Sequence, residues 1–262
     1  NIGRGKSPEM QVVIDGSDAN TGKIIQSGVS VILSGIVFGA EPVKPLFNMQ
    51  PRVWYNPDME GVNFVVPGLV AVFLMMIATI LTSITIAREK ETDTMIQLRL
   101  SPASASQIII GKVLPYTLLA FIVGLLMLVF ALMYYQVPFH GSPWLLAILS
   151  IAYLLASLSI GLFISTLAGS QQVAMAAGMM GTMLPSILLS GFIFPLRSMP
   201  VALQWISTII PAKYFLEILR GVMLKANSMI YLWPPLYSLL IFTFIVMAIS
   251  IFRFRRQFRI AG

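Results

Sequence analysis

Residues 16–23 (GSDANTGK) hold the glycine, hydroxyl and lysine residues from which phosphate-binding loops are built. A P-loop places four residues between its first glycine and the Gly-Lys pair, followed by a Ser or Thr that holds magnesium. This segment has one residue more in that interval and continues with Ile24. It also belongs to a region that we place outside the cell, away from ATP. We therefore interpret residues 16–23 as a surface turn.

No set of side chains typical of an active site assembles in the sequence. There is no cysteine and a single histidine, His140, which excludes disulfides, thiolate catalysis and Cys- or His-based metal centres. His140 has no carboxylate near it in the sequence, so neither a catalytic triad nor a general-base pair is supported. We interpret His140 as a solvated loop residue, and we expect no metal and no catalytic residue.

Residues 113–196 contain no Lys, Arg, Asp or Glu. A water-soluble domain needs charged side chains on its surface, whereas a helix crosses a bilayer with roughly 20 apolar residues. The stretch therefore has room for three membrane spans. Ion-coupled carriers commonly use ionisable groups inside the membrane. Because these spans have none, the energy for any transport must enter from outside the membrane.

The segment Arg88–Pro102 (REKETDTMIQLRLSP) is the candidate for that energy input. It follows a predicted span without Gly or Pro, so the helix can continue or bend along the membrane. Acidic residues come first and Arg99 later, which suits a helix dipole, and Pro102 ends the element. We interpret the segment as a docking helix for a cytoplasmic partner, with a plain connecting helix as the alternative. The expected coupling residues are Arg88, Glu89, Lys90, Glu91, Thr94 and Leu98.

A second segment, Phe194–Gly221, is too charged for a plain span. Its prolines are predicted to divide it into short helices. We expect these helices to lie half-buried in the outer leaflet and to line or close an exit, with a passive cap as the alternative. Glu217 and Arg220 are three residues apart and can pair on a helix. The expected residues of this region are Pro195, Met199, Pro200, Gln204, Pro211, Tyr214, Glu217 and Arg220.

The elements that position these segments are membrane helices. Hydrophobic residues make up 57% of the chain and charged residues 10%, against about 25% charged in soluble proteins. We predict an all-α polytopic membrane protein with five spans in residues 62–262. Three small-xxx-small pairs (Ser157/Gly161, Ala174/Gly178 and Ala177/Gly181) allow close helix packing. The predicted spans are residues 62–87, 113–135, 144–167, 173–194 and 232–252.

Residues 1–61 differ from the rest because they are rich in charges and prolines. Residues 10–14 (MQVVI) read as a strand that ends at a turn beginning with Asp15. Ile24–Ala40 is uncharged but short, and several Ser and Gln lower its hydropathy. We expect an amphipathic helix of a water-exposed domain there, although a span would reverse the orientation of everything before it. We predict part of a small α+β extracytoplasmic domain.

The orientation follows from basic residues beside the spans. Residues 88–112 and the C-terminal tail carry them at high density, which predicts that both are cytoplasmic. We explain the net charge of +7 by such flanking residues, which contact anionic membrane lipid, and we expect no nucleic-acid partner.

Three stretches together resemble the permease subunit of the ABC-2 family of ATP-binding-cassette transporters: residues 52–69 (RVWYNPDMEGVNFVVPGL), 88–102 and 190–221. The turn at residues 15–20 is similar to the start of the outer domain in the bacterial multidrug-export branch. The resemblance implies six spans, with both termini in the cytoplasm and an outer domain between the first two spans. Because we predict five spans here, the resemblance implies that an N-terminal portion with the first span is missing.

The resemblance also implies a mechanism. Arg88–Glu91 would begin a coupling helix, residues 88–100, that contacts a cytoplasmic ATPase subunit. Two permeases, identical or related, would pair, and substrate would leave past outer re-entrant helices in residues 195–228. ATP and Mg would belong to the ATPase, so this chain would bind no cofactor and would not itself be an enzyme. We expect a multi-pass protein of the bacterial inner membrane that exports a hydrophobic or amphipathic compound, drug or lipid-like.

Two other classes remain open. An integral-membrane enzyme that modifies lipid needs polar catalytic groups at the membrane surface, for which only Glu217 with Arg220 qualifies. A secondary carrier is disfavoured by the charge-free spans.

Overall fold

A computed structural model describes residues 9–15, 22, 24–25, 27–29, 31–32, 48–54 and 61–259. The chain divides into two compact units, Asn1–Val65 and Val66–Gly262, and each is described by itself.

The first unit contains a pair of parallel strands, β1 (Glu9–Asp15) and β2 (Asn48–Trp54). Glu9 lies opposite Asn48, and the register continues to Asp15 opposite Trp54. The predicted strand at residues 10–14 lies within β1. Described residues of the predicted helix 24–40, among them Ile24 and Val31, have helical backbone, but the rest of that helix and the turn at 16–20 lie outside the described residues. The strand pair does not by itself establish an α+β domain, which stays a prediction.

The second unit is a bundle of helices, five of which are long and apolar enough to cross a membrane: α2, α4, α5, α6 and α9. The helical membrane bundle predicted from the sequence is thus confirmed. In chain order the helices are α2 (Gly61–Glu91), α3 (Met95–Leu100), α4 (Ala105–Met133), α5 (Pro143–Leu167), α6 (Gln171–Leu189), the 3-10 helix η2 (Leu196–Ser198), α7 (Val201–Ser207), α8 (Pro211–Met223) and α9 (Met229–Arg259).

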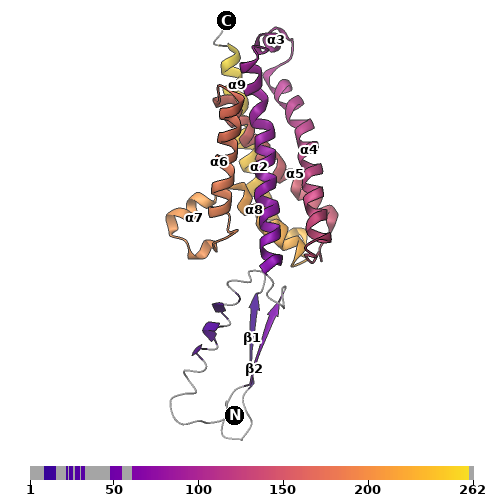
Figure 1. Cartoon of the computed structure of the whole chain (residues 1–262), viewed down its shortest axis with the longest axis vertical. Helices are drawn as coiled ribbons and strands as arrows, with labels where there is room; N and C mark the ends of the chain where they lie inside the picture. The colour runs from indigo at the N-terminus through magenta and orange to yellow at the C-terminus, as the bar shows by residue number, and fades with distance from the viewer. Residues whose placement is uncertain are drawn as a thin grey trace. The chain divides into compact units, whose positions relative to one another are not determined.

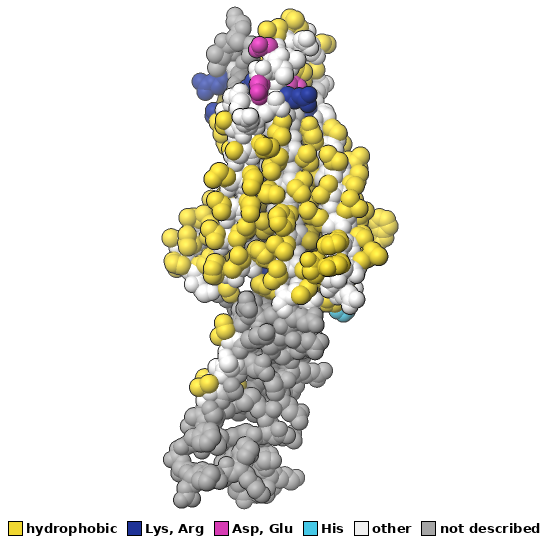
Figure 2. Space-filling view, in the orientation of Figure 1, with side chains coloured by type: hydrophobic (Ala, Val, Ile, Leu, Met, Phe, Trp, Pro, Cys, Tyr) yellow, Lys and Arg dark blue, Asp and Glu magenta, His cyan; other side chains and the backbone are white. Residues whose placement is uncertain are grey.

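The two ends of this bundle differ in what they carry. The short helix α3 lies at the same end as the C-terminus, and α7 and α8 lie toward the other end (Figure 1). We call these the α3 end and the α8 end. Apolar side chains cover the surface of the bundle between them, and most charged side chains visible on this face gather at the α3 end (Figure 2).

Helix bounds differ from the predicted span bounds because a charge ends the membrane-compatible stretch without ending the helix. α4 begins at Ala105, well before the predicted residue 113, and includes Lys112. Its start is fixed by Ser104, whose hydroxyl and backbone form a capping box with Gln107. α6 ends at Leu189 and not at 194, and the chain then turns through Gly191, whose φ of 80° suits glycine.

The core of the bundle surrounds α5. Leu154 and Leu158 in this helix are fully buried. The Tyr153 ring stacks on Phe215 of α8 with 3.9 Å between ring centroids, and its hydroxyl donates to the carbonyl of Ala71 in α2 at 2.6 Å. α5 therefore joins α2 and α8 near the α8 end.

Two of the predicted small-residue pairs serve contacts within the chain. A Cβ added at Gly161 of α5 would lie 2.3 Å from the carbonyl oxygen of Thr79 in α2, so the two backbones approach closely there. Gly178 of α6 faces Ser83 of α2 in the same way, at 3.2 Å from its hydroxyl oxygen. The third pair, Ala177/Gly181, lies on the exposed face of α6.

Candidate functional site

The predicted coupling segment 88–100 is not one helix. α2 continues through Glu91, a turn follows at Thr92–Thr94, and α3 begins at Met95. Asp93 has a φ of 57°, a left-handed conformation that a short polar residue tolerates but a helix does not. The Thr92 hydroxyl donates to the carbonyl of Arg88 at 2.8 Å. The sequence left open whether the helix continues or bends along the membrane, and the structure shows that it bends at this left-handed turn.

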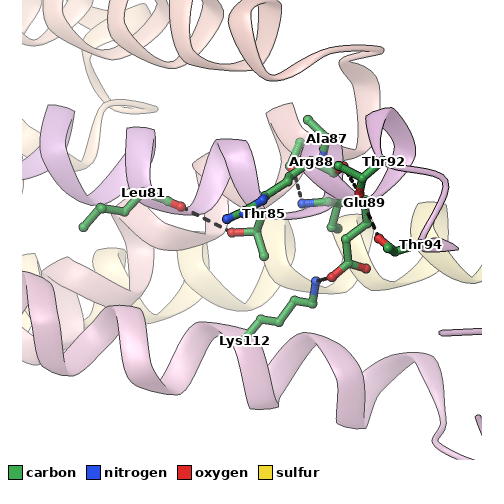
Figure 3. Close-up of polar contacts among 10 residues, drawn as sticks. Leu81, Thr85, Ala87, Arg88, Glu89, Thr92, Thr94 and Lys112 are labelled. Atoms are coloured by element: carbon green, nitrogen blue, oxygen red, sulfur yellow. Dashed lines mark hydrogen bonds and ion pairs between the residues drawn. The ribbon is translucent and has the colours of Figure 1, made fainter. Parts of the chain in front are cut away.

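Three consecutive charged residues at the end of α2 each contact a different helix. Glu89 pairs with Lys112 of α4 (Figure 3). The ammonium of Lys90 donates to carbonyls at the end of α5, at 2.8 Å to Thr166, 3.1 Å to Ala168 and 3.3 Å to Ser165. The carboxylate of Glu91 accepts from Gln171 at the start of α6, at 2.8 Å from its backbone nitrogen and 3.2 Å from its side-chain nitrogen. We call Glu89, Lys90 and Glu91 the end cluster.

Two of these contacts also complement helix dipoles. The last carbonyls of a helix and its first N–H groups lack partners within the helix. Lys90 brings positive charge to the carbonyl end of α5, and Glu91 brings negative charge to the N–H end of α6. Each arrangement is worth about 0.3–1 kcal/mol at a surface and more where it is partly buried. The end cluster thus fixes α2 to three neighbouring spans.

A row of hydroxyl groups continues from the end cluster along the contact between α2 and α5. Ser165 accepts from the backbone nitrogens of Ile86 at 2.8 Å and Ala87 at 3.1 Å. The Thr82 hydroxyl donates to the carbonyl of Leu158 at 3.0 Å, and the Thr79 hydroxyl donates to that of Ser157 at 3.1 Å. In a membrane such bonds hold helices together, at about 0.6 kcal/mol each on average. These hydrogen bonds therefore join α2 to α5 along their contact.

α3 divides its apolar residues between two faces. Met95 is buried and Leu98 packs partly against the core, whereas Ile96 and Leu100 are 61% and 82% exposed. The predicted coupling residue Leu98 is therefore turned inward, and the exposed apolar side chains of α3 are those of Ile96 and Leu100, which lie outside the predicted coupling set. The sequence spacing indicates that Ile96 and Leu100 share a face, because residues four apart lie on the same side of a helix.

The three prolines of the second charged segment stand where breaks were predicted. Pro195 precedes η2, Pro200 precedes α7, and Pro211 is the first residue of α8, a position that suits proline. α7 is peripheral, with Trp205 72% exposed. One face of α8, with Phe215 and other apolar residues, is buried inside the bundle, and the place of this helix in the outer leaflet stays a prediction.

Other predicted residues of this segment hold its loops in place. The Gln204 side chain donates to the carbonyl of Met199 at 2.9 Å, and the Tyr214 hydroxyl donates to that of Thr208 at 2.7 Å. Arg220 donates to the carbonyl of Gly191 at 3.3 Å, which connects α8 to the turn after α6. Glu217 is exposed. Gln204, Tyr214 and Arg220 thus each make a separate contact that supports a loop or turn.

Residues 1–252 match the family described as ABC-2 family transporter protein. The chain is 34% identical to the probable multidrug ABC transporter permease YbhR of Escherichia coli over 251 residues, 95% of this chain and 68% of that protein. It is also 34% identical to the probable multidrug ABC transporter permease YbhS over 223 residues, 83% of this chain and 59% of that protein.

A third relative is ABC transporter G family member 20 of Dictyostelium discoideum, 25% identical over 189 residues, which are 72% of this chain and 26% of that protein. The chain thus spans 59% of the length of YbhS and 68% of that of YbhR. The family match and both identities above agree with the residues that carried the resemblance. This chain is a multi-pass membrane protein and belongs to the ABC-2 family of transporters.

Proposed function

We propose that this chain is the membrane-spanning permease subunit of an exporter that moves a hydrophobic or amphipathic compound, drug or lipid-like, out of the cell. The energy comes from ATP hydrolysed with Mg on a separate cytoplasmic ATPase subunit, and the chain itself is not an enzyme. Support comes from the family and from relatives named as multidrug ABC transporter permeases. The observation that carries the proposal is α3, whose exposed apolar face stands beside a charged cluster that contacts three spans.

In this proposal the two parts of the coupling segment have different roles. Ile96 and Leu100 contact the ATPase, with Arg88 and Thr94 beside them. Glu89, Lys90 and Glu91 act within the chain, because their charged groups already contact α4, α5 and α6. A movement of α3 would pass through the end of α2 to three spans at once.

The proposal includes an orientation. The α3 end faces the cytoplasm of a bacterial inner membrane, and α7 and α8 face outward. Exposed Arg253, Arg255 and Arg256 near the end of α9 add positive charge at the α3 end, as cytoplasmic faces usually carry. Tyr134 and Tyr135 end α4 at the opposite side and are 71% and 44% exposed, which suits a membrane surface. A second permease, identical or related, completes the transporter.

The test replaces the exposed apolar face of α3. The double variant Ile96→Ser with Leu100→Ser should lose co-purification of the ATPase and lower ATP-driven transport by about tenfold, since about 1.4 kcal/mol of lost contact changes binding tenfold. Ile110→Ser is the matched control, because Ile110 is 53% exposed on α4 and lies outside α3. Wild-type transport by the double variant would exclude docking through α3. Activity that needs no ATPase would favour a lipid-modifying enzyme.

A further inference from the structure

A cavity of about 100 Å³ lies between α2, α4, α5 and α8, toward the α8 end. Its floor consists of side chains that are buried in the bundle: Leu74, Leu146, Leu154, Phe215 and Leu219. Its rim includes Gly124 and Leu125 of α4 and Pro143 at the start of α5. None of the residues that line this cavity takes part in the contacts that join α2 to α4, α5 and α6 at the α3 end.

The lining of the cavity is hydrocarbon with one exception. Ser150 is the lining residue with a polar side chain, and its hydroxyl donates to the carbonyl of Leu146 at 2.7 Å. A water molecule in a cavity needs two to four polar partners, and an apolar cavity that lacks them stays dry and accepts apolar ligands. An occupant is therefore held mainly by apolar contact, which favours a hydrocarbon chain over a lipid headgroup.

The cavity opens on the exposed apolar surface of α4. α4 is the least buried of the five long helices, and it approaches α2 at Gly124, where an added Cβ would lie 3.2 Å from Leu74. Leu125 lies on the rim and is 51% exposed, next to the exposed Leu126. An acyl chain of a surrounding membrane could reach an exposed apolar surface of this kind and enter the cavity without crossing water.

We propose that this cavity binds the terminal carbons of a membrane-lipid acyl chain, which enters beside Leu125 and ends against Phe215 and Leu219. Its size fits that occupant. An apolar cavity of about 150 Å³ takes benzene or xenon, and sites for drug-sized molecules measure about 300–1,000 Å³. The site is therefore too small for a transported drug. The chain end would support Phe215, which stacks on Tyr153 and so joins α8 to α5.

The experiment uses phosphatidylcholine vesicles in which a small fraction of the lipid carries a diazirine at the end of one acyl chain. After irradiation, mass spectrometry maps the labelled residues. We expect label on Leu154, Phe215 and Leu219, which are at most 2% exposed and beyond the reach of bulk lipid, as well as on exposed Leu126. The same lipid with its diazirine beside the headgroup should not label the three buried residues.

Two substitutions on α4 make a matched pair. Gly124→Leu fills the cavity and should lower the label on the three buried residues at least fivefold while Leu126 keeps its label. Gly111→Leu makes the same change where an added Cβ meets nothing within 4 Å, and it should leave the label unchanged. Ala147→Leu fills the cavity from α5 and repeats the test if Gly124→Leu does not fold. The proposal would be overturned if the three buried residues carried no label in the unaltered chain. It would also be overturned if they carried as much label in both filled variants as in the unaltered chain.

Discussion

The α3 end and the α8 end of this bundle are held together by different forces. At the α3 end, Glu89, Lys90 and Glu91 use charged groups with directed contacts to Lys112 and to helix termini. At the α8 end, the Tyr153–Phe215 stack and buried apolar residues hold α8 beside a cavity. Directed polar contacts fix one geometry, whereas apolar contact allows small changes in packing. Under the proposed function, this difference would suit one end that receives force from an ATPase and another end that lets substrate pass.

The largest test of this comparison is at the α8 end. Phe215→Ala removes one ring of the stack and enlarges the cavity, so we expect a loss of about 3 kcal/mol in the free energy of unfolding. Phe→Ala in the cores of soluble proteins costs about 3–5 kcal/mol. We expect the lower value here, because helices in a membrane associate without a hydrophobic driving force. Thermal unfolding of the purified protein measures the loss.

Tyr153→Phe is the matched control for that loss. It keeps both rings of the stack and removes only the hydrogen bond to Ala71, at a cost of about 1 kcal/mol. If Tyr153→Phe proved as destabilising as Phe215→Ala, polar contact would hold this end as well, and the contrast between the two ends would fail.

The second test is Lys90→Met at the α3 end. It leaves three carbonyls of α5 without their ammonium donor, and hydrogen bonds to charged groups contribute about 1.5–3 kcal/mol. We expect a loss of about 2 kcal/mol in thermal unfolding and a fall in ATP-driven transport. Arg88→Met removes the same charge from the neighbouring exposed position and should change stability by less than about 0.5 kcal/mol. Equal losses in both variants would show that total charge matters and not the contact to α5.

The sequence predicted the membrane helices because apolar runs of that length have few other structures. It did not predict where the helices begin, because Lys112 lies inside α4 and the start is set by Ser104. It did not predict that α8 buries one face in the bundle, because Lys213, Glu217 and Arg220 were counted only as total charge. Their spacing puts them on one face of a helix, which leaves the opposite face free to be buried.

The contacts of the end cluster could not be predicted from the sequence, because they join residues far apart in the chain. Lys90 contacts backbone carbonyls 75 to 78 residues away, and no residue type marks a carbonyl as an acceptor. Charges next to a predicted span were assigned to an outside partner because their partners within the chain depend on tertiary packing. The exposed face of α3, in contrast, follows from helical period alone.

The smallest test is the Glu89–Lys112 pair. Its side chains are 22% and 21% exposed, so water and salt still weaken the attraction, and we expect about 1 kcal/mol of coupling in a double-mutant cycle with Glu89→Gln and Lys112→Met. The exchange Glu89→Lys with Lys112→Glu should recover stability and transport, because the pair acts between α2 and α4 within this chain. Since partly exposed charges are screened, the coupling should fall as salt rises. An exchanged pair that folds normally but no longer recruits the ATPase would instead place Glu89 on the partner, and the end cluster would be a docking site and not a connection between spans.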